Sequence, residues 1–385
     1  RCIPRAADRG RPQEPRPSRM TVGVVGAGQL GRMLALAGYP LGLDFLFLDP
    51  ASEAPAGQVS PQICGAFTDG RLLAQLARKT EVLTFDWENI SVAALRDLPK
   101  GTRICPPINA LAAAQDRVKE KQLFERLSIP TTRWRAVEST AQLARAVAEI
   151  GLPGVLKTRR LGYDGKGQRV LRQPADVQCA WDALGNAPLL YEELVPFDYE
   201  VSIIGARSTR GEIVIYPLNG NVHGEGILRL TRAPYGPAAL QRLAARYLRK
   251  ALSHFKYTGI LTIEFFVRRG RLIANEMAPR VHNSGHWTIE GAETSQFENH
   301  LRAILGMPLG STRARGHCAM INLIGKMPVR DELLAMDGLH LHDYGKAPRP
   351  GRKLGHLTLV ERSATARDRR AQRLLSGLAP GTRIP

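Results

Sequence analysis

The chain has 385 residues, which at about 100–200 residues per domain predicts two or three domains. Its hydrophobic content of 44% and charged content of 23% are typical of a folded globular protein and exclude wholesale disorder. The formal net charge of +19 favours anionic ligands. Aromatic residues make up only 6% and are not interleaved with basic ones, so we expect no nucleic-acid partner.

Two further classes of protein are excluded by the sequence. The chain has no run of 18 apolar residues, so we expect no membrane span. Its five cysteines are odd in number, lie far apart and form no Cys-x-x-Cys pair. This spacing argues against a disulfide framework or a structural zinc site, and fits a reducing cytoplasm.

Residues 1–19 are rich in Arg and Pro and lack apolar periodicity, so we expect a disordered extension. From Thr21 the pattern is an apolar strand, a glycine-rich turn, a helix and a second strand that ends at Asp49. A later strand is predicted over residues 82–85, and Cys105-Pro106-Pro107 ends the domain. We therefore predict a Rossmann-like domain over residues 20–108.

The glycine-rich turn has a recognisable spacing. Gly26, Gly28 and Gly31 follow a strand and open a helix, and Asp49 lies about 20 residues further on. This is the dinucleotide fingerprint, in which glycines let the backbone approach a phosphate at a helix N-terminus. Three interpretations stay open at this point: NAD or FAD binding, binding of another phosphate, and tight packing of strand on helix.

The middle of the chain alternates helices and strands. Asn109 is predicted to cap a helix that runs to about Leu127. Ser139 is predicted to cap a second helix ending at Gly151, and Ser295 a third ending near Gly306. Predicted strands cover residues 154–158, 189–194 and 199–204, and a hairpin pairs residues 261–267 with 272–277. Residues 311–316 form a predicted linker, followed by a strand-rich end.

Two glutamates stand on the predicted hairpin. If it closes symmetrically about Gly270, Glu264 lies opposite Glu276 on one face. Two opposed carboxylates repel, and a divalent cation held with nucleotide phosphates offsets that repulsion. The alternative is two solvated charges on an exposed face.

A lysine and a glycine-rich segment follow the second helix. Lys157 ends a buried strand, and residues 159–168 then combine three glycines with Lys and Arg. Such a segment can cover a polyphosphate, although no Gly-Lys-Ser/Thr opens a helix, so it is not a P-loop. An exposed basic turn is the alternative.

These features occur in the order typical of the ATP-grasp superfamily, and the chain resembles it. More narrowly, it resembles the 5-(carboxyamino)imidazole ribonucleotide synthase family from Met20 to about Val360. The resemblance is carried by GAGQLGRM at 26–33, QDR at 115–117, GYDGKGQ at 162–168, NEMAPRVHNSGHW at 275–287, YGK at 344–346 and PGRKLGH at 350–356.

Four positions depart from the pattern of that family. Asp86 stands where the family usually has Glu, Val281 where it has Pro, and Leu161 where many members have a second Gly. Ala278 occupies the place of a metal-binding Asn in many ATP-grasp enzymes. The resemblance therefore implies a metal held by two glutamates alone.

The fold implied by the resemblance is α/β (α+β): an ATP-grasp fold with a Rossmann-like preATP-grasp domain before it and a small strand-rich domain after it. We expect the ATP-grasp domain over residues 109–312 and the C-terminal domain over residues 313–385.

The resemblance also implies the site residues. ATP is expected to contact Arg117, Lys157, Gly162, Tyr163, Asp164, Gly165, Lys166, Gly167, Gln168, Glu192, Glu193, Leu194, Val195, Glu200, His223, Asn275 and Glu276. Magnesium is expected at Glu264 and Glu276. The residues expected in the reacting region are Arg280, His282, Tyr163, Asp164 and Lys166. The ribonucleotide is expected at Gln29, Leu30, Glu88, Lys346, Arg352 and Lys353.

The implied reaction joins ATP, bicarbonate and 5-aminoimidazole ribonucleotide. Bicarbonate attacks the γ-phosphate to give carboxyphosphate, and the amine of the ribonucleotide then captures the carboxyl group. A cytoplasmic homodimer with a functional link to a mutase subunit is also implied. Three alternatives stay open: a nicotinamide dehydrogenase, a formate-using glycinamide ribonucleotide transformylase of the same superfamily, and a non-enzymatic RNA binder.

Overall fold

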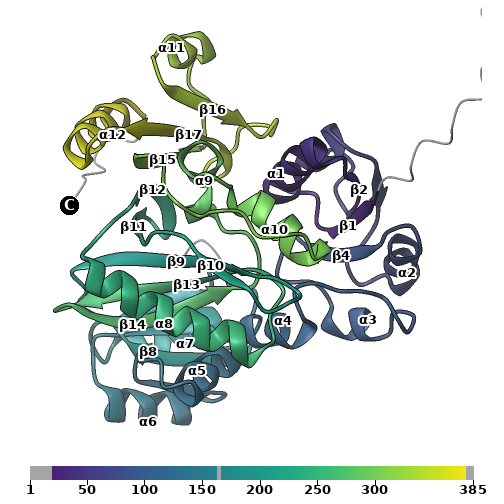
Figure 1. Ribbon diagram of the computed structural model, residues 1–385. Coiled ribbons are helices and arrows are strands. Elements are labelled where there is room, and N and C mark those ends of the chain that lie inside the picture. The colour runs from purple at the N-terminus through teal and green to yellow at the C-terminus, as the bar shows by residue number, and fades with distance from the viewer. Residues whose placement is uncertain (1–19, 163–165, 379–385) are drawn as a thin grey trace, which may run out of the picture.

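The computed structural model describes residues 20–162 and 166–378. These residues form three sheets, and Figure 1 shows the two smaller ones beside and below the largest. The predicted extension at residues 1–19 lies outside the described part of the chain. No helix in the described residues is long and apolar enough to cross a bilayer.

The N-terminal part is a parallel sheet with the strand order β3-β2-β1-β4. Its central strands β1 and β4 are apolar and almost fully buried, as expected for a sheet covered on both faces. The strands are β1 (Thr21–Val25), β2 (Asp44–Asp49), β3 (Gln62–Cys64) and β4 (Val82–Phe85); the helices are α1 (Gln29–Gly38), η1 (Tyr39–Leu41), η2 (Pro55–Gln58), α2 (Gly70–Arg78) and α3 (Val92–Arg96). The predicted strand, turn, helix, strand pattern is confirmed.

A small antiparallel sheet follows, with the order β5-β8-β6-β7. Helices α6 and α7 pack on it around a core that contains Leu143, Leu156 and Tyr191. Its elements are β5 (Trp134–Val137), α6 (Thr140–Ile150), β6 (Gly154–Thr158), β7 (Gln168–Leu171), α7 (Asp176–Leu184) and β8 (Leu189–Glu193). Ser139 caps α6 and Gly151 ends it, as predicted.

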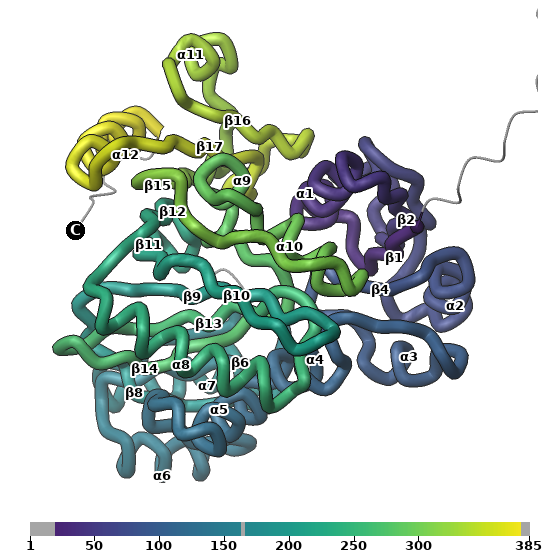
Figure 2. The backbone as a smooth tube through the Cα atoms, in the orientation of Figure 1, coloured from purple at the N-terminus to yellow at the C-terminus, as the bar shows by residue number. Residues whose placement is uncertain are grey.

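The largest sheet joins the central and C-terminal parts of the chain. Its order is β14-β13-β9-β11-β12-β15-β17-β16, with β10 added beside β9. Because β12 pairs with β15, one sheet crosses the predicted boundary near residue 312 (Figure 2). Its strands are β9 (Tyr199–Arg207), β10 (Ile213–Ile215), β11 (Asn219–Gly224), β12 (Ile227–Ala233), β13 (Gly259–Arg268), β14 (Arg271–Ala278), β15 (His317–Ile324), β16 (Leu339–Asp343) and β17 (Lys353–Glu361).

The helix predicted from Asn109 to Leu127 is wrong in its extent, because the structure divides it in two. Asp116 has extended backbone angles and accepts a hydrogen bond from the Val118 N–H, so it caps a new helix. The other helices of this half are α4 (Ile108–Ala114), α5 (Arg117–Arg126), α8 (Ala238–His254), η3 (Asn283–Gly285), α9 (Thr288–Gly291), α10 (Gln296–Leu305), α11 (Arg330–Leu334) and α12 (Ala364–Leu378). The break places Arg117 in the first turn of α5.

The hairpin of β13 and β14 sets the geometry of the site. Arg269 and Gly270 form its turn, with φ angles of 49° and 72°. That turn alone would put Glu264 opposite Asn275, but a bulge shifts the register so that Glu264 pairs with Glu276. The predicted pairing is therefore confirmed. It arises from an extra residue in β14 rather than from symmetric closure.

Candidate active site

A buried carboxylate between two lysines lies where the small sheet meets α5. Glu192 of β8 contacts Lys157 of β6, and its other oxygen lies 2.9 Å from Nζ of Lys121. Thr132 donates a further hydrogen bond to Glu192 at 2.5 Å. Although burial opposes ionisation, these cations hold the pKa of Glu192 well below its usual range. Burial itself lowers the pKa of Lys157.

This cluster carries a net positive charge where the resemblance expects ATP phosphates. Lys121 was not among the expected site residues. Its Nζ also donates to the hydroxyls of Thr131 and Thr132, both at 3.0 Å. Its spacing from Arg117, one turn along the same helix, was the available signal.

We expect Glu192→Gln to lower the free energy of unfolding by about 3–5 kcal/mol, because it leaves two buried lysines without their carboxylate. The neighbouring Glu193 pairs with Arg133, whose side chain is 64% exposed. Glu193→Gln is therefore the matched control, with an expected loss of at most about 1 kcal/mol. Urea denaturation of both variants measures the difference. Equal losses of unfolding free energy in the two variants would show that the buried cluster stabilises the fold no more than the exposed pair does.

Each of the paired glutamates has its own polar partner in the structure, a cation for one and an imidazole for the other. Glu276 lies 3.3 Å from Arg117, and Glu264 lies 3.2 Å from Nε2 of His282. These contacts offset part of the repulsion that we had assigned to a cation alone. Burial and the Glu276 charge still raise the pKa of Glu264 to about 7.

A third carboxylate, Glu120, lies behind the hairpin and was not foreseen from the sequence. It is buried and accepts a hydrogen bond from the Met277 N–H at 2.6 Å. Burial and the charge of Glu276 raise its pKa to about 8. Glu120 therefore fixes the backbone next to Glu276.

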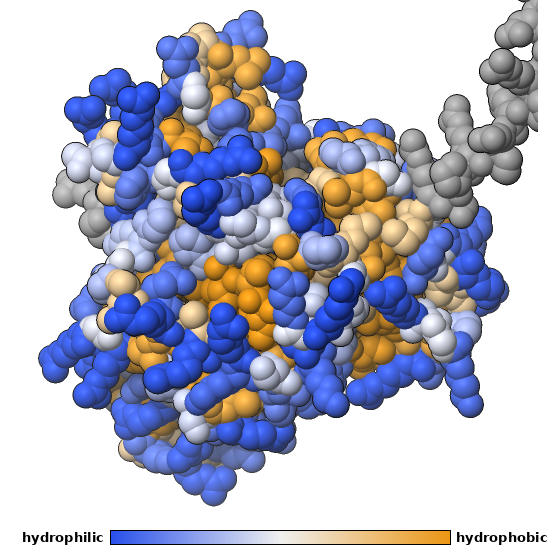
Figure 3. Space-filling view, viewed as in Figure 1, coloured by the Kyte–Doolittle hydropathy of each residue, from blue (hydrophilic) through white to orange (hydrophobic). Residues whose placement is uncertain are grey.

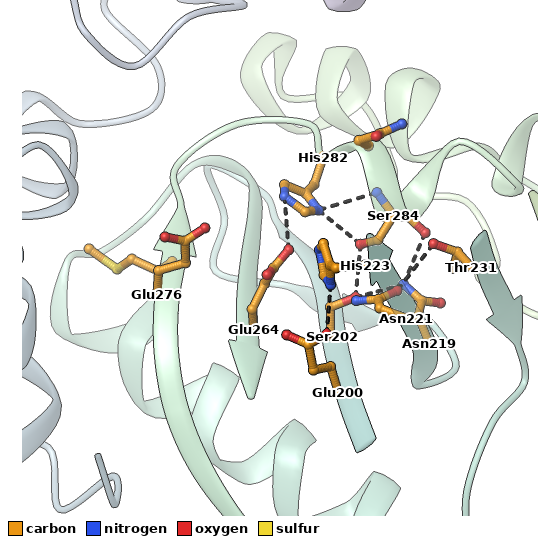
Figure 4. A network of polar contacts seen from close by, with 12 residues as sticks. Glu200, Ser202, Asn219, Asn221, His223, Thr231, Glu264, Glu276, His282 and Ser284 are labelled. Carbon is orange, nitrogen blue, oxygen red and sulfur yellow. Dashed lines mark hydrogen bonds and ion pairs between the residues drawn. The ribbon is translucent and has the colours of Figure 1, made fainter. Parts of the chain in front are cut away.

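Beside the glutamate pair, Glu200 of β9 accepts a hydrogen bond from Nδ1 of His223 at 2.7 Å (Figure 4). Burial lowers the pKa of His223, but the hydrogen bond and the charges of Glu200 and Glu264 outweigh it and raise the value to about 9. His223 is therefore a cation at neutral pH, on the same side of the sheet as the hairpin glutamates.

A second group of residues links the three parts of the chain. Arg280 donates to Glu88 at 2.5 Å, and Lys346 donates to Gln29 at 2.5 Å. The charge of Lys353, at the start of β17, acts on both Glu88 and Glu264. Although burial opposes it, Arg280 lowers the pKa of Glu88. Lys346 thus contacts the N-terminal part, and the charge of Lys353 acts on one N-terminal and one central carboxylate.

Several other expected residues take definite places. The side chain of Leu30 is buried in the core, so only its backbone can meet a ligand. Val195 is buried, and Leu194 donates its N–H to the Pro153 carbonyl at 3.2 Å. The side-chain oxygen of Asn275, in the bulge, is buried without a hydrogen-bond partner among the described residues. Arg352 donates to the Ala347 carbonyl at the surface.

The glycine-rich covering segment is only partly described. Tyr163, Asp164 and Gly165 lie outside the described residues; Gly162, Lys166, Gly167 and Gln168 lie within them. Leu161 is 70% exposed and has φ of 62°, a conformation that glycine adopts more readily. The backbone at position 161 therefore has a conformation that suits the glycine many family members carry there.

The N-terminal glycine loop holds a side chain of the same chain. A Cβ atom on Gly26 or Gly28 would lie 1.7 Å or 2.8 Å from a carboxylate oxygen of Asp86. Asp86 accepts a hydrogen bond from the Gly31 N–H at 3.2 Å, at the start of α1. Asp49 accepts from the Ala27 N–H at 2.8 Å. Two N–H groups that a dinucleotide phosphate would use are thus engaged by carboxylates, and Asp49, which a ribose would use, is engaged by the loop itself.

This burial gives a pH-dependent prediction. Burial raises the pKa of Asp86 from 3.8 to about 7, so its contribution to stability is complete below pH 4 and is lost as the pH rises to 7. Asn cannot ionise. We therefore expect the stability of Asp86→Asn relative to the wild type to rise between pH 4 and 7, as measured by urea denaturation at each pH. A flat difference would contradict the buried carboxyl.

Three family models match the chain in order. They are the ribonucleotide synthetase preATP-grasp domain over residues 19–115, the ATP-grasp domain over 122–297 and the phosphoribosylaminoimidazole carboxylase C-terminal domain over 318–370. The N5-carboxyaminoimidazole ribonucleotide synthase of Pseudomonas aeruginosa is 52% identical over 340 residues, covering 88% of this chain and 94% of that protein. The chain belongs to the N5-carboxyaminoimidazole ribonucleotide synthase family.

Solved structures agree with this membership. The N5-carboxyaminoimidazole ribonucleotide synthetase of Thermus thermophilus matches with a TM-score of 0.90 at 48% identity, covering 94% of this chain and all of that one. The Aspergillus clavatus synthase, solved with ADP and 5-aminoimidazole ribonucleotide, matches with a TM-score of 0.88 at 30% identity, covering 94% and 98%.

Membership in this family confirms the ATP-grasp fold and the ligase class that the sequence indicated. The chain is an ATP-grasp ligase of purine biosynthesis. The dehydrogenase interpretation, which relied on the glycine loop, loses its support because Asp86 and Asp49 use the donors of that loop.

Proposed function

We propose that this chain catalyses the ATP- and bicarbonate-dependent carboxylation of 5-aminoimidazole ribonucleotide to N5-carboxyaminoimidazole ribonucleotide. The observation that carries the proposal is the junction at Arg280, Glu88 and Lys353, where all three parts of the chain meet beside the hairpin glutamates. This arrangement supports a phosphate site and a ribonucleotide site next to each other.

ATP binds between the small sheet and the hairpin. Lys157 and Arg117 contact the phosphates, with Lys121 adding to the positive charge. The backbone of residues 192–195 meets the adenine edge, and Glu200 takes the ribose hydroxyls. The glycine-rich segment from Gly162 to Gln168 covers the phosphates. In support, Lys157 pairs in register with Gln168, so the end of this segment lies beside the lysine of β6.

Magnesium fits the donor set of the hairpin. Mg²⁺ prefers oxygen ligands and commonly takes one or two carboxylates together with substrate phosphates. Among residues 20–162 and 166–378, no group of three or more His, Cys, Asp or Glu side chains is arranged to hold a metal ion. Glu264 and Glu276 would thus hold the ion together with the nucleotide. When bound, the magnesium ion would neutralise the negative charge that develops on the phosphates.

The chain's own residues position the reactants. Phosphoryl transfer depends mainly on positioning and electrostatics, and the cations Lys157, Arg117 and Lys121 supply both where bicarbonate attacks the γ-phosphate. Arg280, fixed by Glu88, holds an oxyanion of the carboxyl group during its transfer. Tyr163, Asp164, Lys166 and His282 complete the reacting region.

The ribonucleotide binds where the N-terminal and C-terminal parts approach each other. Gln29 and Lys346 are hydrogen bonded across this approach, and Gln58 donates to the Gly345 carbonyl at 3.0 Å. Lys346, Arg352 and Lys353 are cations suited to a phosphate, and Glu88 can accept from ribose hydroxyls. The α1 backbone at Gln29 and Leu30 contributes its N-terminus to the same site.

The test is ADP release with 5-aminoimidazole ribonucleotide, with and without bicarbonate. We expect release to require both, and N5-carboxyaminoimidazole ribonucleotide to appear as the product. Release that depends on formate and glycinamide ribonucleotide would favour the transformylase alternative instead. RNA retention without any ATP turnover would favour the RNA binder.

A cytoplasmic homodimer is also proposed, with its product passed to a mutase subunit. Exposed apolar side chains on the N-terminal part support the dimer: Leu36 is 46% exposed and Tyr39 38%. Figure 3 shows apolar surface at the upper right, over this part of the chain. Leu36 borders a groove of about 330 Å³ between α1 and α10. Sedimentation equilibrium measures the oligomeric state.

A further inference from the structure

A chain of buried polar groups leads from the core of the large sheet to His282 (Figure 4). It begins at Asn219 of β11, whose side-chain oxygen accepts from Nε1 of Trp287 at 2.9 Å. Its side-chain nitrogen donates to the Ser284 carbonyl at 3.2 Å. Since an indole N–H can only donate and a carbonyl can only accept, both ends of the Asn219 amide are fixed.

The fixed Asn219 amide and the neighbouring Asn221 amide both donate to the next residue of this network. Ser202 of β9 accepts a hydrogen bond from Asn219 at 3.3 Å and another from Asn221 at 3.0 Å. These two donors use the acceptor capacity of its hydroxyl. Its own hydrogen is then donated to the hydroxyl of Ser284, 2.8 Å away. Ser202, Asn219 and Ser284 are buried, so water does not compete.

Ser284 links this network to the imidazole of His282. Its hydroxyl lies 2.8 Å from Nδ1 of His282, and because Ser202 donates to it, its own hydrogen is available to that nitrogen. Its backbone N–H also donates to Nδ1, at 3.3 Å. A backbone N–H cannot accept, so this bond leads to the same result without using the orientation of any hydroxyl. Nδ1 is therefore an acceptor and carries no proton.

We propose that Ser202 and Ser284 are positioning residues that hold His282 as the neutral tautomer with its proton on Nε2. That Nε2–H faces Glu264, 3.2 Å away, and donates to it. One oxygen of Glu264 is thus fixed, and the other is the one through which this carboxylate can act as a ligand. In this state His282 is a hydrogen-bond donor and cannot remove a proton through Nε2.

The consequence for the reaction rests on the proposed function, but the tautomer does not. Because the orientation and tautomer of His282 are fixed, Glu264 keeps its orientation and need not reorganise when the nucleotide binds. Loss of one hydrogen bond between Ser202, Ser284 and His282 should therefore reduce turnover more strongly than it reduces the affinity for ATP.

Nitrogen NMR of the ¹⁵N-histidine-labelled wild-type enzyme, with His282→Gln used to assign the signal, tests the tautomer directly. We expect a protonated-type shift at Nε2 and an unprotonated-type shift at Nδ1 of His282. A proton on Nδ1, alone or together with Nε2, would overturn the proposal. This measurement needs no substrate, so it remains decisive if the proposed reaction is wrong.

Substitutions of the two serines test their positioning role. For Ser284→Ala and Ser202→Ala we expect kcat to fall about 3- to 10-fold with KM for ATP unchanged within about twofold, and the two His282 nitrogen shifts to move toward each other. Thr262→Val is the matched control, because the Thr262 hydroxyl is buried on β13 without a hydrogen-bond partner among the described residues. Serine variants that match this control in kcat and in both shifts would remove the positioning role.

Discussion

Glu276→Gln should reduce magnesium-dependent ATP turnover by at least about 100-fold while the protein stays folded. The side chain keeps its volume but loses the charge that would hold the cation. Removal of a single oxyanion-hole donor, a contact that likewise stabilises developing charge, costs about 10²–10³ in rate. Glu276 lies opposite Glu264 and raises the pKa of both Glu264 and Glu120. Removing its charge relieves that repulsion.

The apo protein should therefore be little affected by this substitution. The lost ion pair with Arg117 is partly exposed, since the Glu276 side chain is 43% accessible, and such pairs contribute at most about 1 kcal/mol. ADP release against magnesium concentration measures turnover, and urea denaturation measures stability. Glu225→Gln is the control, because the Glu225 side chain is 88% exposed and pairs with Arg229 on the same surface. Normal turnover of Glu276→Gln at ordinary magnesium concentrations would remove the hairpin from the metal site.

The sequence predicted the hairpin and its facing glutamates because alternation along a strand fixes which side chains share a face. It did not predict the bulge at Asn275 that produces the pairing, since a bulge depends on packing beyond the two strands. The helix break at Asp116 was missed for a similar reason. Asp116 binds Arg159 at 2.8 Å, a contact between positions far apart in sequence.

Family motifs indicated most of the candidate site, but not how its charges pair. Nothing in the local sequence showed that Glu192 lies between two lysines, or that Arg117 contacts Glu276. The glycine loop is the clearest case. Its spacing fits a dinucleotide, yet the ligand at its helix is Asp86, from the end of the adjacent strand β4. Short-range patterns predict which backbone groups are available, and the tertiary fold decides what they bind.

Lys353→Ala should raise KM for 5-aminoimidazole ribonucleotide by about 10- to 150-fold, the cost of losing one charge-assisted hydrogen bond of roughly 1.5–3 kcal/mol. KM for ATP should change by less than about threefold. Lys353 opens β17, on the C-terminal part of the large sheet, while the expected phosphate cations Lys157 and Arg117 lie on the central part. Lys326→Ala is the control, because Lys326 is exposed in the neighbouring turn after β15.

The electrostatics of the site make this test decisive in both directions. The charge of Lys353 acts on Glu88, which is expected to hold the ribonucleotide, and also on Glu264, which is expected to hold the metal with ATP. If its main role is beside Glu264, its removal raises KM for ATP as much as KM for the ribonucleotide. Steady-state kinetics with each substrate varied in turn separates the two roles. A rise in KM for ATP alone, or no change beyond that of Lys326→Ala, would exclude Lys353 from the ribonucleotide site. It would also remove the main argument that the C-terminal part binds substrate.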